Sequence, residues 1–365
     1  MNSSSNALTY ALAALLIGAA LVYAAVKFGL VALILPADAR TKPITEASRG
    51  GDFTGAVEKF DALMEQKNVS SVEKARAIWS VASARFEATG DMQTYLQDIE
   101  LMKESIVDET VPLYIRVSLI NDVASSYCAS GRTPEVFAAI YSGEPFAQHL
   151  VPGDPNLSSR KMHEWSWSLR PTAKAAVRIA RWYAEELVYN KSLTAAERVA
   201  YTQKAKDLVF DGEGLAKLES ERLKDKFDTS KRNVGYQFWR AMTIGSLAAA
   251  GDQESKGQYR SEFDSFLAML ANYDNADARD DYKPYAELFF AWFLLNVDKD
   301  EAAARAHIET AVSSVRNSNV ATNEFAIFLA NESSKPAWDF ASMVSEEMRA
   351  FSPAYDALIK EMLGA

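Results

Sequence analysis

The chain has 365 residues, of which 48% are hydrophobic and 24% charged, and its formal net charge is −10 at pH 7. This is the composition of a globular protein, which excludes wholesale disorder, collagen-like repeats and a protein with many membrane spans. The acidic excess offers no basic field to phosphate backbones, so nucleic acid is not expected as a partner. Only 16 Gly and 11 Pro are present, which favours helices over an all-β architecture.

The N-terminal segment, residues 1–36, is predicted to be a membrane anchor. From Ala7 to Leu35 the chain is apolar except for one charge, at Lys27. The 20 residues from Ala7 to Val26 would span about 30 Å as a helix, which is the thickness of the hydrocarbon core of a bilayer. Lys27 is therefore expected at the membrane interface, either snorkelling from a tilted helix or preceding a short apolar stub.

A cleavable signal peptide is the alternative interpretation of this segment. Ala37-Asp38-Ala39 resembles a cleavage site, but no Lys or Arg precedes the apolar run. The run also exceeds the usual signal-peptide core of about 7–15 residues, so we expect a retained, single-pass anchor in the cell membrane. Positive residues follow the segment, which weakly favours a cytoplasmic domain. The single cysteine suits an extracytoplasmic domain, so the side of the membrane stays open.

Regularly spaced glycine turns divide the next part of the chain. After a polar connector expected over residues 37–50, turns recur at Gly51, Gly90 and Gly131, which lie 39 and 41 residues apart. Amphipathic runs with apolar residues at helical spacing lie on both sides of each turn. A helix, a tight turn and a second helix form the hairpin that stacks into α-solenoids. Residues 51–142 are therefore predicted to be helical repeats.

The first of these repeats resembles a tetratricopeptide (TPR) motif. In the run GDFTGAVEKFDALM, glycine stands at the turn, Ala56 at the close contact between helices, and Phe60 one turn later. Trp79, with Phe86 seven residues on, is similar to the first helix of the following repeat. The resemblance implies a right-handed superhelix of paired helices whose concave groove binds peptides or partner proteins. The spacing of about 40 residues departs from the 34 of the family.

Residues 143–171 interrupt the repeats and are predicted to be a long ordered loop or a hinge between two helical halves. The prediction depends on the prolines that crowd this segment: Pro145, Pro152, Pro155 and Pro171. Helical patterns return over residues 172–365. Within that half, two separate helices are expected at about 195–210 and 213–227.

Two capping-box motifs indicate helix starts, one at Ser70 with Glu73 and one at Thr194 with Glu197. No alternation typical of β-strands occurs anywhere in the chain. The expected fold class is all-α: a TPR-like helical-hairpin solenoid preceded by a single transmembrane helix.

Sites of chemistry are scarce. The sequence contains no phosphate-binding glycine loop, no dinucleotide fingerprint, no zinc helix and no nucleophile elbow. Its single cysteine is Cys128, and two of its three histidines, His149 and His163, share the proline-rich segment. A site built on those two histidines is possible, but unrelated loop histidines are the favoured interpretation. No catalytic residue, metal or cofactor is therefore expected.

A basic and aromatic cluster is the best candidate for a partner-binding site. Its members are Arg160, Lys161, Trp165, Trp167, Arg170, Lys174 and Arg178. Because Trp and Arg dominate binding hot spots, this cluster is expected to hold an acidic peptide or the carboxylates of a partner protein. In the alternative interpretation, the cations neutralise acidic helices and the tryptophans fill the junction between the two halves.

These features favour a non-enzymatic, membrane-anchored scaffold that binds partner proteins through a helical solenoid. A permanent structural subunit of a large membrane complex is one alternative. A cell-wall hydrolase with a helical superhelix is a weaker one, because such an enzyme needs a compact catalytic domain, and the C-terminal half carries no motif for it.

Overall fold

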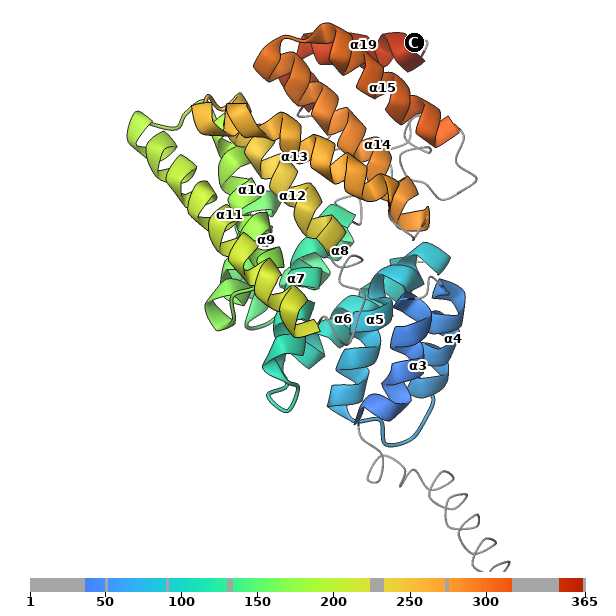
Figure 1. Ribbon diagram of the computed structural model, residues 1–365. Helices are drawn as coiled ribbons and strands as arrows, with labels where there is room; N and C mark the ends of the chain where they lie inside the picture. Colours follow the sequence, from blue (N-terminus) through green and yellow to red (C-terminus); the bar gives the residue numbers. More distant parts are fainter. Residues whose placement is uncertain are drawn as a thin grey trace, which may run out of the picture. The chain divides into compact units, whose positions relative to one another are not determined.

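The protein is all-α in the part of the chain that its structure, a computed structural model, describes (Figure 1). The described residues are 37–49, 52–89, 92–129, 134–223, 233–272, 276–316 and 348–363. They contain no β-strand, and many of their helices pack together in pairs. The chain divides into two compact units, Met1–Leu119 and Ile120–Ala365. Each unit is described by itself.

The first unit is built from helices that bury one apolar face each. Helices α3 (Ala37–Arg49), α4 (Phe53–Met64) and α5 (Ser71–Thr89) pack against one another, and α6 (Met92–Val107) packs against α5. The apolar residues of α4 and α6 recur at three- and four-residue spacing, which places them on one side of each helix. The fully buried ones are Ala56, Phe60 and Leu63 in α4 and Ile99, Met102 and Ile106 in α6.

Residues 37–50, predicted to be a polar connector, are instead mostly helix α3. Ile44 is the buried apolar residue of this helix. Polar side chains of α3 make further contacts, with Ser80 of α5. The Ser48 hydroxyl donates to the carbonyl oxygen of Ser80 at 2.7 Å, and the hydroxyls of Thr45 and Ser80 lie 2.9 Å apart. The helix was missed because hydrogen bonds to a residue more than 30 positions away leave no apolar period in the sequence.

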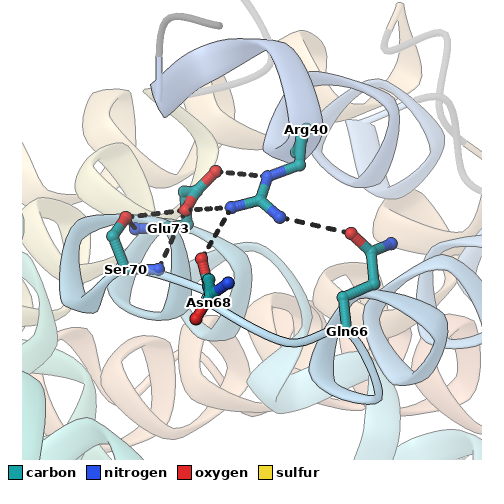
Figure 2. Close-up of polar contacts among 5 residues, drawn as sticks. All are labelled: Arg40, Gln66, Asn68, Ser70 and Glu73. Carbon is teal, nitrogen blue, oxygen red and sulfur yellow. Dashed lines mark hydrogen bonds and ion pairs between the residues drawn. The ribbon is translucent and has the colours of Figure 1, made fainter. Parts of the chain in front are cut away.

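A partly buried ion pair attaches α3 to the start of α5 (Figure 2). Nε and Nη2 of Arg40 each donate to one carboxylate oxygen of Glu73, both at 2.6 Å. The guanidinium also reaches the side-chain oxygen of Gln66 and the backbone oxygen of Asn68, both at 3.2 Å. Burial disfavours the charged form of Glu73, but the hydrogen bonds from Arg40 and Ser70 outweigh it and hold the pKa of this carboxyl below its usual value.

The Glu73 carboxylate is also half of the predicted capping box. Its Oε2 accepts from the backbone N–H of Ser70 at 2.9 Å and from the Ser70 hydroxyl at 2.7 Å, while the Ser70 Oγ accepts from the N–H of Glu73 at 3.3 Å. The box at Thr194 and Glu197 has the same reciprocal geometry. Both predicted capping boxes are confirmed.

The second unit continues the succession of helices. Helix α7 (Leu113–Ala129) crosses the boundary between the units along the chain. The elements that follow it are α8 (Pro134–Tyr141), η1 (Phe146–His149), α9 (Pro155–Leu169), α10 (Ala173–Tyr189), α11 (Ala195–Leu223), α12 (Asn233–Ala249), α13 (Gln253–Ala271), α14 (Ala276–Phe293), η3 (Leu294–Asp298), α15 (Glu301–Arg316), α18 (Met348–Phe351) and α19 (Pro353–Leu363). Hairpin partners α10 and α11, α12 and α13, and α14 and α15 pack closely, and α10 also packs on α12.

The proline-rich segment 143–171 is not a long loop, because more than half of it is helix α9. Asp154 caps this helix by accepting from the N–H of Leu157 at 2.8 Å. Pro155 occupies the first turn, where the missing N–H costs no hydrogen bond, and Pro171 follows the last turn. These prolines therefore mark the ends of a helix. The predicted break between 210 and 213 is also wrong, since α11 is continuous from Ala195 to Leu223.

Aromatic side chains fill the core between α12, α13 and α14. Phe263 and Phe290 stack with ring centroids 4.9 Å apart, and Trp292 is fully buried. Helix α12 approaches this core so closely at Gly245 that a Cβ there would lie 2.6 Å from the ring of Phe293. The turn at Gly251 has a positive φ of 102°, which glycine adopts without strain.

The predicted membrane anchor, Ala7–Leu35 with Lys27, lies outside the described residues. None of the helices in the described ranges combines the length and apolar character that crossing a membrane requires.

Candidate functional site

Helix α9 carries four of the seven predicted partner-binding residues, but on two of its faces. Arg160 and Trp167 are seven residues apart, close to two full turns, and so share a face. Lys161 and Trp165 are one turn apart on an adjacent face. The first pair meets residues of α10 and α11, and Trp165 meets η1. The four residues therefore do not form a single patch.

Arg160 is held between two aromatic rings and a carboxylate. Its guanidinium carbon lies 4.1 Å from the ring centroid of Trp182 and 5.1 Å from that of Tyr183. Its Nε lies 3.2 Å from Oε1 of Glu164, one turn further along α9. This is a cation–π contact combined with an ion pair, on side chains that stay partly exposed.

Trp165 fixes the short helix η1 to α9. Its ring stacks on His149 with centroids 4.9 Å apart and meets Phe146 edge-on at 5.8 Å. Burial, together with the nearby charge of Lys161, lowers the pKa of His149. The neutral imidazole is therefore the favoured form against the indole ring, and Trp165 acts mainly as a packing residue.

Trp167 is likewise a packing residue. It is partly buried and rests on a small apolar cluster made of Ala176, Ile179, Ala180 and Leu208. This cluster joins α10 to α11 inside the second unit. The geometry thus favours the interpretation in which the two tryptophans fill contacts between helices over the one in which they line a recognition surface.

The remaining cations lie at the end of α9 and along α10. Arg170 caps α9 and is partly exposed. Lys174 is exposed, and its Nζ lies 2.5 Å from Oδ1 of Asp122. The guanidinium of Arg178 covers the ring of Trp239 at 4.0 Å. Some of these cations therefore pair with acidic or aromatic neighbours within the chain. This agrees in part with the alternative interpretation of the sequence, in which the cations neutralise acidic helices.

Helix α10 nevertheless brings a basic and aromatic surface together. Lys174, Arg178 and Trp182 follow one another at four-residue spacing, so they lie on one stripe of the helix. We call these three residues the α10 stripe. All three are exposed or partly exposed, and Arg160 from α9 stacks on the last of them. The stripe with Arg160 is the candidate site.

Sequence reasoning missed the acidic members of this site. Glu164 is four residues from Arg160, a spacing that predicts an ion pair on a helix. No local signal could have revealed Asp122, because 52 residues separate it from Lys174. Tyr183 and Tyr201 extend the aromatic group, with ring centroids 4.9 Å apart.

The histidines do not suggest a metal centre. His163 is fully buried, and its Nδ1 lies 3.0 Å from Oδ1 of Asn121. Burial, with the charges of Arg178 and Lys174, lowers the pKa of His163 well below its usual value. Within the described ranges, no group of three or more His, Cys, Asp or Glu side chains is placed to hold a metal ion.

Comparison with protein-family models, curated proteins and solved structures finds no match for this chain.

Proposed function

We propose that this protein is a non-enzymatic scaffold, anchored in the membrane by its N-terminal segment, residues 1–36, that binds a partner protein through its helical repeats. The observation that carries the proposal is the α10 stripe with Arg160 stacked on Trp182. Helix α10 is the first helix of a hairpin with α11. In TPR-like solenoids, which the sequence of residues 51–142 resembles, the first helices line the binding groove.

The chemistry of the stripe favours an acidic partner. A guanidinium that stacks on an aromatic face keeps its N–H groups in its own plane, parallel to the ring, where they can still donate to a carboxylate. Partial burial of the Trp182 ring removes water from one side of that contact, which strengthens it. The proposed ligand is therefore an acidic segment of another protein. The anchor would hold the site at the membrane surface and raise its effective concentration there.

Site-specific photo-crosslinking tests the proposal. A photoreactive residue is placed at Lys174 or Trp182 in the full chain, and at Lys256 as a control, since Lys256 is exposed on α13. We expect the same partner adduct from both stripe positions and none from the control position. Adducts that appear equally at all three positions would contradict a defined site.

Charge reversal then tests the role of the cations. Lys174→Glu with Arg178→Glu should abolish recovery of the crosslinked partner, while Lys256→Glu should leave recovery unchanged. Helicity by circular dichroism shows whether each variant is folded. A folded double variant that keeps the partner would remove the stripe from consideration.

Recovery of the partner at fixed stoichiometry from the first purification step would favour the permanent subunit over the scaffold.

A further inference from the structure

The outer face of α11 carries large apolar side chains that the described chain leaves open. Val199 is 72% exposed, Phe210 78% and Leu218 62%. The opposite face of the helix packs inward through Ala205, Leu208 and Ala216. Placing a phenylalanine in water at the middle of a helix gains nothing for folding, because its apolar area stays hydrated.

Two glycines in the same helix show which face is built for contact within the chain. A Cβ on Gly212 would lie 3.2 Å from the Cβ of Ala176, so this glycine allows the close approach of α10. A Cβ on Gly214 would meet no atom of the described chain within 4 Å. Glycine in a helix interior is less favourable for the helix than alanine. Nothing in the described chain makes use of Gly214.

The open residues follow the spacing of a helix–helix seam. Asp207, Phe210, Gly214 and Lys217 lie at intervals of three, four and three residues, which places them on one exposed stripe. We call these four residues the α11 seam. It combines a large apolar side chain, a position without a side chain, a negative charge and a positive charge.

We propose that the α11 seam pairs with the same seam of a second copy of this chain, with the two helices antiparallel. When Phe210 of one copy faces Gly214 of the other, the two-fold symmetry also places Asp207 opposite Lys217, twice. Each phenylalanine then fills the space over a glycine, and each acidic residue meets a basic one. In a parallel pair in register, each charge would face its own like charge, which is unfavourable.

The seam is separate from the candidate partner site, which lies on α9 and α10. The α11 helix has 29 residues and is about 43 Å long. It packs on α10 along its inner side and contacts α12 only lightly. In Figure 1 it runs along the outer side of its own unit. Self-association through α11 therefore leaves the α10 stripe available, so either proposal can be rejected without affecting the other.

Sedimentation velocity of the full chain in mild detergent, over a range of concentrations, tests the association. We expect a concentration-dependent dimer. Phe210→Ala should weaken it by about tenfold or more, the scale of a hot-spot truncation. Gly214→Ala should also weaken the dimer while raising the helix stability of the monomer. Lys191→Asp, an exposed charge in the turn before α11, should leave the dimer unchanged.

Charge exchange tests the antiparallel register. Asp207→Lys and Lys217→Asp should each weaken the dimer, because each variant opposes like charges. Mixing the two single variants should restore association as a heterodimer, and the double exchange in one chain should restore the homodimer. A wild-type chain that stays monomeric, or a dimer that Phe210→Ala leaves intact, would overturn the proposal. A mixture that associates no better than either variant alone would reject the antiparallel register.

Discussion

Helices are held together by different forces in the two units of this molecule. In the first unit, buried charges and hydroxyls make many of the contacts: Arg40 binds Glu73, and Arg85 binds the fully buried Asp98. In the second unit, α12, α13 and α14 meet through stacked aromatic rings such as Phe263 and Phe290.

This difference has consequences for specificity and for stability. A buried ion pair has a fixed geometry, so it can specify how one helix sits on another, but the loss of one partner leaves an unpaired charge. Aromatic packing depends on volume and is insensitive to pH and salt. The first unit should therefore respond to changes of charge and pH, and the second to changes of side-chain volume. The predictions that follow test this contrast.

The largest effect is expected from removing α3. Deleting residues 1–36 should leave the first unit folded, because α3 begins at Ala37. Deleting residues 1–50 also removes Arg40 and the buried Ile44, which leaves Glu73 without its cation. We expect the cooperative unfolding of the first unit to disappear only in the longer deletion, as followed by circular dichroism and limited proteolysis. Equal behaviour of the two deletions would show that α3 is dispensable.

Phe263→Ala should cost about 3–5 kcal/mol in the free energy of unfolding, since it removes a fully buried ring. Urea unfolding at pH 5 and pH 8 measures the loss. The cost should be nearly the same at both pH values, because neither of the two stacked rings carries a charge. Phe263→Leu keeps most of the volume and should cost clearly less. A strong pH dependence of the loss would contradict the comparison.

The two capping boxes offer a matched pair in the next prediction. Glu73→Ala removes a cap and also takes the carboxylate from the guanidinium of Arg40, which keeps its hydrogen bonds to Gln66 and Asn68, so it should cost up to about 3–5 kcal/mol. Glu197→Ala removes the same motif at an exposed helix start, where the described residues place no cation on the carboxylate, and should cost clearly less. Urea unfolding of both variants at pH 7 gives the difference. Equal costs would mean that the Arg40 pair adds nothing.

Ala56→Phe tests the close helix contact that the TPR resemblance implies. Ala56 is fully buried in α4, so a large ring should overpack the contact and cost about 1–3 kcal/mol. Thermal unfolding measures the loss, and Ala62→Phe on the exposed side of the same helix serves as the control. An unchanged melting curve for Ala56→Phe would count against close packing at this position.

Asp98 should impose a pH dependence on the stability of the first unit. Burial raises the pKa of Asp98 from 3.8 to about 7, although the charge and the hydrogen bond of Arg85 lower it. Because the folded-state pKa lies above the unfolded value, the folded state binds more protons between these two values. The contribution of Asp98 to the free energy of unfolding is then fully present below pH 3.8 and is lost as the pH rises through about 7. Asp98→Asn should remove this part of the pH dependence.

Chemical denaturation between pH 4 and pH 8 measures the effect. As the pH rises, the free energy of unfolding of the wild type should fall relative to that of Asp98→Asn. Asp61→Asn, at the half-exposed carboxylate that also contacts Arg85, should keep most of the wild-type pH dependence. Parallel pH curves for the wild type and Asp98→Asn would show that Asp98 does not change its protonation in this range.

Local patterns in the chain predicted the all-α class correctly, together with both capping boxes. Each of these depends on residues within a few positions of one another. A capping box needs only a side chain three residues from a free N–H. Such features can be read from the sequence because the physics that produces them is itself local.

The tertiary structure alone decided which neighbours each charge meets. In the sequence, Lys174 and Arg178 are equivalent members of a basic cluster, but in the fold Lys174 meets Asp122 and Arg178 covers Trp239. Helix α3 was hidden for the same reason, since its contacts with Glu73 and Ser80 join residues more than 30 positions apart. Hydrogen bonds and ion pairs between distant residues have no period along the chain, so only the packed helices show which groups they join.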